Sequence, residues 1–346
     1  MNRFWNCLIV FGLAALVLAA RLPAQDPVTG ARLSGPVLGF VDDADAGIRP
    51  MLGVPGSAFL GPAVPVPGGL SAVAFAPVSG FALALAGDRR QPVVVRGLAN
   101  APAVASITGL APGADRFEMS PTGSAAAFLY QAEGKLRLVS GLPDDPRLAA
   151  EFDLSGIASD LGALAVSDDA GSALAVSANE GQAWLLLCRL NSEPKRWLAV
   201  SAAATLSFFP GTSDAALADP ERNQVSLVKA TAEAGAPTLL ASASNGVAAP
   251  AAVVTSLDGR WIVVANSNPT ALAVIAVADG TVTLVPCDIP VPKLYRLGSN
   301  ALFRLTDAAA SPIWLLDGDS SPPRMLFVPR GQAGPKGAPA GQGGVR

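Results

Sequence analysis

The chain has 346 residues, of which 51% are hydrophobic and only 15% are charged, and its net charge at pH 7 is −3. It contains three Cys and no His, which excludes a Ser-His-Asp triad, a Cys-His dyad and any structural zinc site built from Cys and His. The slightly acidic balance argues against nucleic acid as a partner.

The first predicted element is a secretory signal peptide over residues 1–24. Arg3 precedes an apolar run at 7–20, and small residues up to Ala24 offer cleavage sites. The run is shorter than the ~20 residues that span a bilayer. The alternative, an uncleaved N-terminal anchor, would also place the body outside the cytoplasm. We therefore expect a secreted or periplasmic protein, with no membrane association after cleavage and a linker over 25–35.

The body that follows, residues 36–330, is predicted to be all-β. Helical periodicity is almost absent, and short runs of Val, Ile, Leu, Ala and Phe alternate with turns that contain Gly, Pro, Asp or Asn. The first two strands are expected at 38–42 and 47–52. Because these strands are similar to the last two strands of a later repeat, at 274–284, we expect the N-terminus to contribute half of a repeat unit.

From Leu70 onward one unit recurs, consisting of an apolar strand, a turn with Ser, Asp or Gly, a second apolar strand and two further strands. In the first unit the four strands are expected at 70–75, 81–86, 92–95 and 104–107. The turn recurs at spacings of 43, 48, 42, 46 and 40 residues, measured between Gly80, Gly123, Gly171, Ser213, Gly259 and Ser299.

A period in the low to middle forties with four strands per unit is typical of a β-propeller blade. Six full units over 70–330, together with the N-terminal half-blade, predict a single seven-bladed propeller. The alternatives are six blades with an added edge ribbon, or a solenoid, although β-solenoid coils are usually much shorter. A closed ring leaves only short strand edges exposed, so we expect it to be monomeric.

The tail over 331–346 is rich in Gly and Pro and contains no side chain that could anchor a core, so it is expected to be disordered. Cleavage of the leader would leave two cysteines, Cys188 and Cys287. The repeat spacing places them on units that are not neighbours. We therefore expect two buried thiols, although an oxidising compartment would permit a disulfide.

The segment 255–267 (TSLDGRWIVVANS), followed by 273–275 and 279–282, resembles the repeat of YVTN-type and WD40-like β-propellers. In that family the Ser-x-Asp-Gly turn joins the two inner strands of a blade. The match is degenerate in the other units, and the Gly-His and Trp-Asp signatures of WD40 blades are missing. The resemblance implies the fold but no single activity, because such propellers include lactonase-like enzymes, binding modules and assembly scaffolds.

Carboxylates cluster at 42–45, 144–145, 168–169 and 317–319. Calcium-type ions prefer oxygen ligands of this kind on a loop. Every cluster falls at a predicted hairpin turn, however, where Asp commonly bonds to its own backbone. None of them completes an Asp-x-Asp-x-Asp-Gly loop, so the turn interpretation is preferred and any metal ligands are left undefined.

The segment 192–195 matches the Ser-x-x-Lys pattern of a Ser nucleophile activated by Lys. Pro194 disfavours the helical turn that this pattern needs, so the segment is predicted to be a hairpin loop. Four tryptophans fall in predicted strands, where packing between blades is the expected role. They are Trp184, Trp197, Trp261 and Trp314.

These observations assign no residue a catalytic or cofactor-binding role. The preferred hypothesis is a secreted, non-enzymatic propeller without a cofactor, which binds a protein, peptide or glycan with the loops of one ring face. The alternative is a lactonase-like hydrolase that holds a calcium-type ion on carboxylates in the central channel. The alternative requires acidic side chains to converge on the axis of the ring.

Overall fold

The computed structural model describes residues 35–329, with the exception of 68, 159, 180, 232–235, 308 and 311. The predicted signal peptide, the linker up to residue 34 and the tail over 331–346 lie outside the described residues. The described part contains 27 strands and two single-turn 3₁₀ segments. None of its helical segments is long and apolar enough to cross a bilayer.

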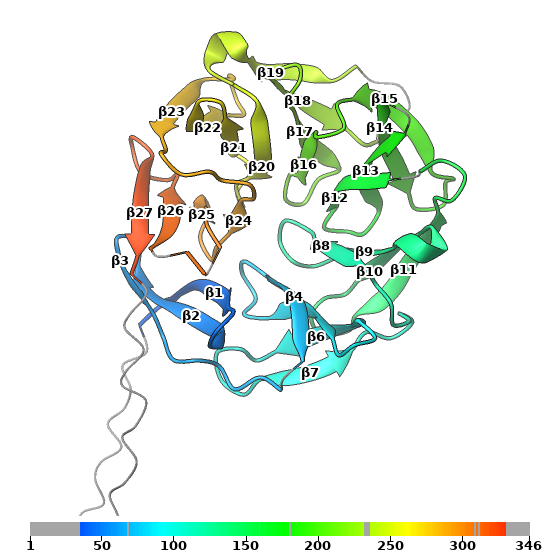
Figure 1. Ribbon diagram of the computed structural model, residues 1–346, viewed down its shortest axis with the longest axis vertical. Helices are drawn as coiled ribbons and strands as arrows, with labels where there is room; N and C mark the ends of the chain where they lie inside the picture. Colours follow the sequence, from blue (N-terminus) through cyan, green and yellow to red (C-terminus); the bar gives the residue numbers. More distant parts are fainter. Residues whose placement is uncertain are drawn as a thin grey trace, which may run out of the picture. The chain divides into compact units, whose positions relative to one another are not determined.

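The strands form seven antiparallel sheets that are arranged as blades around a ring (Figure 1). Six sheets have four strands each, paired in the order in which they occur in the chain, and the first sheet has three. The prediction of an all-β, seven-bladed propeller is therefore confirmed, and the six-bladed alternative is wrong.

We number the blades 1 to 7 along the chain. Blade 1 consists of β1 (Val37–Asp43), β2 (Gly47–Val54) and β3 (Ser57–Leu60). Blades 2 and 3 consist of β4 (Leu70–Phe75), β5 (Ala82–Ala86), β6 (Gln91–Arg96), β7 (Ala103–Ser106), β8 (Arg116–Met119), β9 (Ala126–Tyr130), β10 (Lys135–Ser140) and β11 (Arg147–Asp153), with the 3₁₀ turn η1 (Gln131–Glu133).

Blades 4 and 5 consist of β12 (Asp160–Val166), β13 (Ser172–Asn179), β14 (Gln182–Arg189), β15 (Lys195–Val200), β16 (Thr205–Phe208), β17 (Asp214–Asp219), β18 (Gln224–Lys229) and β19 (Thr238–Ser242). Blades 6 and 7 follow the 3₁₀ turn η2 (Ala243–Asn245) and consist of β20 (Pro250–Thr255), β21 (Trp261–Ser267), β22 (Thr270–Ala276), β23 (Val282–Pro286), β24 (Tyr295–Arg296), β25 (Leu302–Arg304), β26 (Ile313–Asp317) and β27 (Arg324–Val328).

The first four-stranded unit matches its prediction to within one residue at each strand end. Its second strand, β5, is a continuous apolar run that is buried along almost its whole length. The middle strands of a blade are covered on both faces by the neighbouring blades. Apolar residues therefore occupy consecutive positions in these strands and do not alternate with polar residues. The outermost strand, β7, is partly exposed at every position.

The predicted Ser-x-Asp-Gly turn joins β20 to β21 in blade 6. Ser256 Oγ donates to Asp258 Oδ1 (2.6 Å) and accepts from the backbone N–H of Trp261 (2.9 Å). In blade 4 the same bonds recur, with Ser167 Oγ donating to Asp169 Oδ1 (2.6 Å). A repeated local turn of this kind sets the register of the two inner strands.

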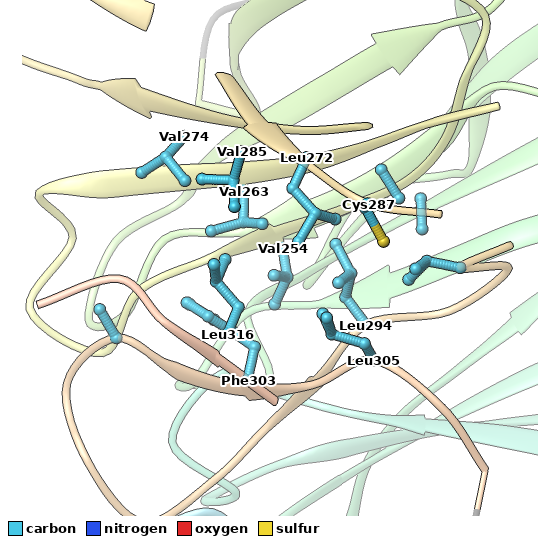
Figure 2. Close-up of a cluster of buried hydrophobic side chains, with 14 residues drawn as sticks. Val254, Val263, Leu272, Val274, Val285, Cys287, Leu294, Phe303, Leu305 and Leu316 are labelled. Carbon is cyan, nitrogen blue, oxygen red and sulfur yellow. The ribbon is translucent and has the colours of Figure 1, made fainter. Parts of the chain in front are cut away.

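One apolar cluster fills each of the seven interfaces between neighbouring blades. Figure 2 shows the cluster between blades 6 and 7, where Val263 and Leu272 meet Phe303 and Leu316. The predicted role of the tryptophans in packing is confirmed for three of them, which contact these clusters: Trp197, Trp261 and Trp314. Trp184 lies in β14 and is partly buried.

The N-terminal segment differs from its prediction, because it forms a three-stranded blade where half a blade was expected. A tight turn at Gly56, with φ at +87°, returns the chain so that β3 pairs with β2. Leu38 and Val41 of this blade pack on Leu302 of blade 7. The ring is therefore closed by side-chain packing between its first and last blades.

Both cysteines of the body are free and buried, as expected. Cys188 lies in blade 4, and Cys287 follows the last strand of blade 6. Burial raises the pKa of Cys188 to about 12, so its thiol is protonated at neutral pH.

Candidate ligand site in the central channel

The first strands of blades 2 to 7 surround a central channel and lie nearest the ring centre in Figure 1. Two cavities of about 250 Å³ each lie along these strands. Residues of blades 3 to 7 line the first cavity, and residues of blades 1, 2, 3 and 7 line the second. Charged side chains common to both cavities are Arg116, Glu118, Lys293 and Arg296.

An ion pair spans the channel between the two cavities. Lys293 precedes β24 in blade 7, and its Nζ lies 3.3 Å from Oε2 of Glu118, which belongs to β8 in blade 3. These blades are not neighbours in the ring, so the pair crosses the interior. The charge of Glu118 raises the pKa of Lys293, and burial opposes this effect. Lys293 is therefore a cation at neutral pH.

Arg296 links three consecutive blades at the wall shared by the cavities. Its Nε donates to the carbonyl oxygen of Thr255 (2.8 Å), and its Nη2 donates to the hydroxyls of Ser207 and Thr255 (2.7 Å each). No described residue accepts a hydrogen bond from its Nη1. Burial lowers the pKa of Arg296 to about 10, so the guanidinium is still charged at neutral pH.

Arg304, at the end of β25, lines the second cavity and is only 7% exposed. Its guanidinium lies over the ring of Tyr295, 3.9 Å from the centroid, and its Nη1 donates to the carbonyl oxygen of Thr306 (3.0 Å). Its buried Nε has no hydrogen-bond partner among the described residues. A buried donor without a partner is unfavourable, and the structure thus leaves a cationic donor available beside this cavity.

The channel is more basic than the chain as a whole. Its lining carries one carboxylate, that of Glu118, and four cations: Arg116, Lys293, Arg296 and Arg304. Burial raises the pKa of Asp42, and the charge of Arg304 opposes this effect. In a protein with a net charge of −3, this concentration of cations favours an anionic ligand.

These residues are not apparent from the sequence, because each of them is isolated among apolar neighbours. Arg116 and Glu118 flank Phe117, and Arg304 lies between Phe303 and Leu305. A charged residue inside a strand that is otherwise buried is the signal that would have identified them. Only the ring closure brings blades 3 and 7 together across the channel.

The predicted carboxylate clusters lie mostly at hairpins, as expected. Asp43 is buried at the β1–β2 hairpin and accepts from Arg49 (3.2 Å). Asp144 and Asp145 are exposed in the β10–β11 hairpin. In the β26–β27 hairpin Asp317 pairs with Arg324 of the same blade (3.1 Å).

Asp168 does not bond to its own turn, as the turn interpretation expected, but to residues of the two neighbouring blades. Its Oδ1 accepts from the N–H (2.9 Å) and hydroxyl (2.7 Å) of Thr122 in blade 3, and its Oδ2 accepts from the N–H of Gly211 in blade 5 (2.8 Å). Asp169, beside it, does bond to its own turn at Gly171 (2.8 Å). The side chain of Asp168 thus connects three blades, because the equivalent turns of neighbouring blades lie on the same face.

A site for a calcium-type ion needs several oxygen ligands around one point. Within the described ranges, no three or more His, Cys, Asp or Glu side chains come close enough to hold a metal ion. The Ser-x-x-Lys segment is confirmed as a loop, since Ser192 and Pro194 lie between β14 and β15.

No protein-family model and no curated protein matches the chain. Solved structures with a similar fold do exist. A candidate 6-phosphogluconolactonase from Bacteroides fragilis is 12% identical with a TM-score of 0.52, over 87% of this chain and 95% of that chain.

Two further structures extend this comparison. Virginiamycin B lyase from Staphylococcus aureus is 11% identical with a TM-score of 0.52, over 75% of this chain and 84% of that chain. The Swd1 β-propeller domain of Myceliophteria thermophila is 12% identical with a TM-score of 0.50, over 75% and 87%. At such identities the likeness shows the propeller fold alone.

Proposed function

We propose that this chain is a secreted, non-enzymatic propeller of the YVTN type that binds an acidic protein, peptide or glycan ligand in its central channel. The observation that supports this proposal is the lining of the channel, with four cations against one carboxylate. Arg304 is the most informative of them, because its guanidinium is buried and its Nε lacks a partner. A ligand carboxylate would supply the missing acceptor in a charge-assisted hydrogen bond.

The protonation of Arg296 and Lys293 favours binding over general-base catalysis by these two side chains. A general base works best when its pKa lies near the operating pH. Arg296 has a pKa of about 10, and Glu118 raises the pKa of Lys293, so both side chains are already protonated at neutral pH. Arg296 and Lys293 therefore present fixed positive charge and hydrogen-bond donors, which suits the recognition of an anion.

The hydrolase alternative makes a separate prediction about metal content. We expect the purified protein to hold no stoichiometric calcium-type ion and to melt at the same temperature with and without a chelator. A bound ion whose removal lowers the melting temperature would support the hydrolase and contradict this proposal.

The direct test is binding of four probes by isothermal titration: hexaglutamate, polygalacturonate, neutral dextran and hexalysine. We expect the two acidic probes to bind, with an affinity that falls as salt is raised. Arg304→Met should weaken that binding by about tenfold or more, which corresponds to one lost charge-assisted hydrogen bond.

The matched control is Arg324→Met, which makes the same change at an exposed hairpin on blade 7, away from the channel lining. It should leave the affinities unchanged. Absence of binding by both acidic probes, or equal binding by Arg304→Met, would show that the channel is not the ligand site.

A further inference from the structure

Strand β1 is the first strand of blade 1, but it runs in the same direction as the second strands of the other blades. At its start, the carbonyl oxygen of Leu38 accepts from the N–H of Gly298 (2.7 Å), which lies just before β25. Farther along β1, Phe40 lines the same cavity as Arg304, the last residue of β25. Strand β1 is therefore parallel to β25, the second strand of the neighbouring blade.

This direction means that the strands of blade 1 correspond to the second, third and outermost strands of the other blades. No described residue forms an inner strand in blade 1. The edge of β1 that faces the channel is therefore not paired by any described strand.

The register of β1 identifies the free backbone groups. The N–H of Gly61 donates to Pro50, which places the backbone groups of Pro50 toward β3. In β1, Phe40 lies opposite Pro50 and Asp42 lies opposite Ile48. Because hydrogen-bonded and non-hydrogen-bonded pairs alternate along an antiparallel ladder, Phe40 and Asp42 direct their N–H and C=O groups away from β2. Such an edge is a template for another strand.

The second cavity lies beside this edge and has a closed end, and aromatic side chains form part of its wall. Phe40 and Phe75 line it, with ring centroids 6.0 Å apart. At the end near Leu38 the turns of blades 7 and 2 meet, since a Cβ on Gly298 would lie 3.1 Å from the carbonyl oxygen of Pro77. Arg296 lies two residues before Gly298 in the chain and lines the cavity, and its guanidinium extends toward Thr255 and Ser207 of blades 6 and 5.

We propose that an extended peptide with a free C-terminal carboxylate adds to the edge of β1 as the inner strand of blade 1, with its carboxylate at Arg296. This inference rests on the proposed function and names the ligand of that site. A peptide antiparallel to β1 runs in the same direction as the six other inner strands. It therefore enters at the Arg304 end and brings its C-terminus to the closed end.

The occupant follows from charge complementarity as well as from backbone pairing. A peptide carboxylate at the closed end would accept from Nη1 of Arg296, which no described residue uses. At the entrance, the unpartnered Nε of Arg304 would donate to a backbone or side-chain oxygen of the peptide. Peptide addition to an open sheet edge combines main-chain hydrogen bonds with pockets for alternate side chains.

The experiment is a fluorescence-polarisation titration with a hexapeptide that carries two glutamates and a C-terminal leucine, labelled at its N-terminus. It is used as the free acid, as the C-terminal amide, and as the free acid with two alternate backbone N-methyl groups. We expect the free acid to bind at least about tenfold more tightly than either analogue, because each analogue loses charge or hydrogen bonds.

A matched pair of variants tests the edge of β1 itself. Asp42→Pro removes an N–H that points away from β2, so the β1–β2 ladder is retained, whereas Asp42→Ala keeps that N–H and removes the same charge. We expect the free acid to bind about tenfold more weakly to Asp42→Pro than to Asp42→Ala. Circular dichroism and thermal melting check that both variants are folded.

Equal binding of the acid and the amide, or of the N-methylated and unmodified acid, would overturn the strand addition while the proposed function stands. Concentration-dependent dimerisation that the free acid does not reverse would also overturn it, because a second copy would then cover the edge. If neither the hexapeptide nor polygalacturonate binds, the proposed function fails as well.

Discussion

Blade 6 and blade 1 show what the repeat provides and what is gained where it is interrupted. Blade 6 has four strands, and its inner turn is held by Ser256 and Asp258. Blade 1 has three strands, and the edge of β1 faces the channel without a described partner. In blade 6 the second strand, β21, is paired on both sides, by β20 and β22, whereas the corresponding strand of blade 1, β1, is paired only with β2. The missing pairing leaves backbone groups of β1 available beside the candidate site.

The three-stranded blade 1 does not open the ring. Blade 1 contributes to an apolar cluster on each side, with Val41 packed toward blade 7 and Phe40 packed toward blade 2. Side-chain packing, which is independent of strand number, thus closes the propeller. In the proposal made above, stability and ligand binding are carried by different parts of the same blade.

The largest effects are expected from truncating buried side chains in both blades. Leu272→Ala in blade 6 and Met51→Ala in blade 1 should each lower the free energy of unfolding by about 2–5 kcal/mol, because both side chains are fully buried between blades. Thermal or denaturant unfolding measures this effect. Leu284→Ala, at a position 50% exposed, is the control and should change little. A negligible effect of Met51→Ala would show that blade 1 is peripheral.

The next effect concerns the link between blades 3, 4 and 5. Asp168→Ala leaves the hydrogen-bonding groups of Thr122 and Gly211 without their acceptor and should lower the free energy of unfolding by about 1–3 kcal/mol. The control is Asp144→Ala in an exposed hairpin, with an expected change within about 0.5 kcal/mol. Equal effects of the two variants would contradict the role given to Asp168.

A smaller effect is expected from pH at the regular turn of blade 6. Burial raises the pKa of Asp258, but hydrogen bonds from Ser256 and Arg260 outweigh it, so the pKa lies below its ordinary value. Such a carboxylate stabilises the fold above its unfolded pKa of about 4, and this stabilisation is lost as pH falls through the folded pKa.

Asp258→Asn should therefore lower the free energy of unfolding above pH 5 and flatten its decline between pH 5 and 2. Denaturant unfolding across this range is the measurement. Asp144→Asn serves as the control and should leave the decline unchanged. An equally steep acid decline in Asp258→Asn would contradict the assignment.

The smallest effect is a chemical one at Cys188. Because burial raises its pKa to about 12, we expect iodoacetamide at pH 8 to modify this thiol only as fast as the protein unfolds. Peptide mapping after timed labelling, with and without denaturant, measures the rate. Rapid labelling of the folded protein would show that the interface between blades 3 and 4 opens locally.

The parts of the fold that were predictable are those set by local chemistry. The turn at Ser256 and the continuous apolar run of β5 are local signals, and their period predicted seven blades, with six as the alternative. Blade 1 was only partly predicted because Ser57–Leu60 is a short strand followed by a proline-rich connection. Its strand status depends on pairing with β2, which the local sequence does not reveal.

The candidate site was not predictable, because it depends on closure of the ring. Lys293 and Glu118 are 175 positions apart in the sequence, and only the circular arrangement brings them within 3.3 Å. The same holds for Arg296, whose acceptors belong to two other blades. Long-range contacts between isolated charged residues leave no periodic pattern in a single sequence.

Amide hydrogen exchange tests the central claim most directly, because it compares the free edge of β1 with the paired second strand of blade 6. In β21, Val263 and Ala265 direct their N–H groups toward β20 by the alternation that starts at the Ser256–Trp261 pair. We predict that the amides of Phe40 and Asp42 exchange at least about a hundredfold faster than these two, and that the free-acid hexapeptide slows them. Equal protection of all four amides in the protein without peptide would contradict the account, because the edge of β1 would then already be paired.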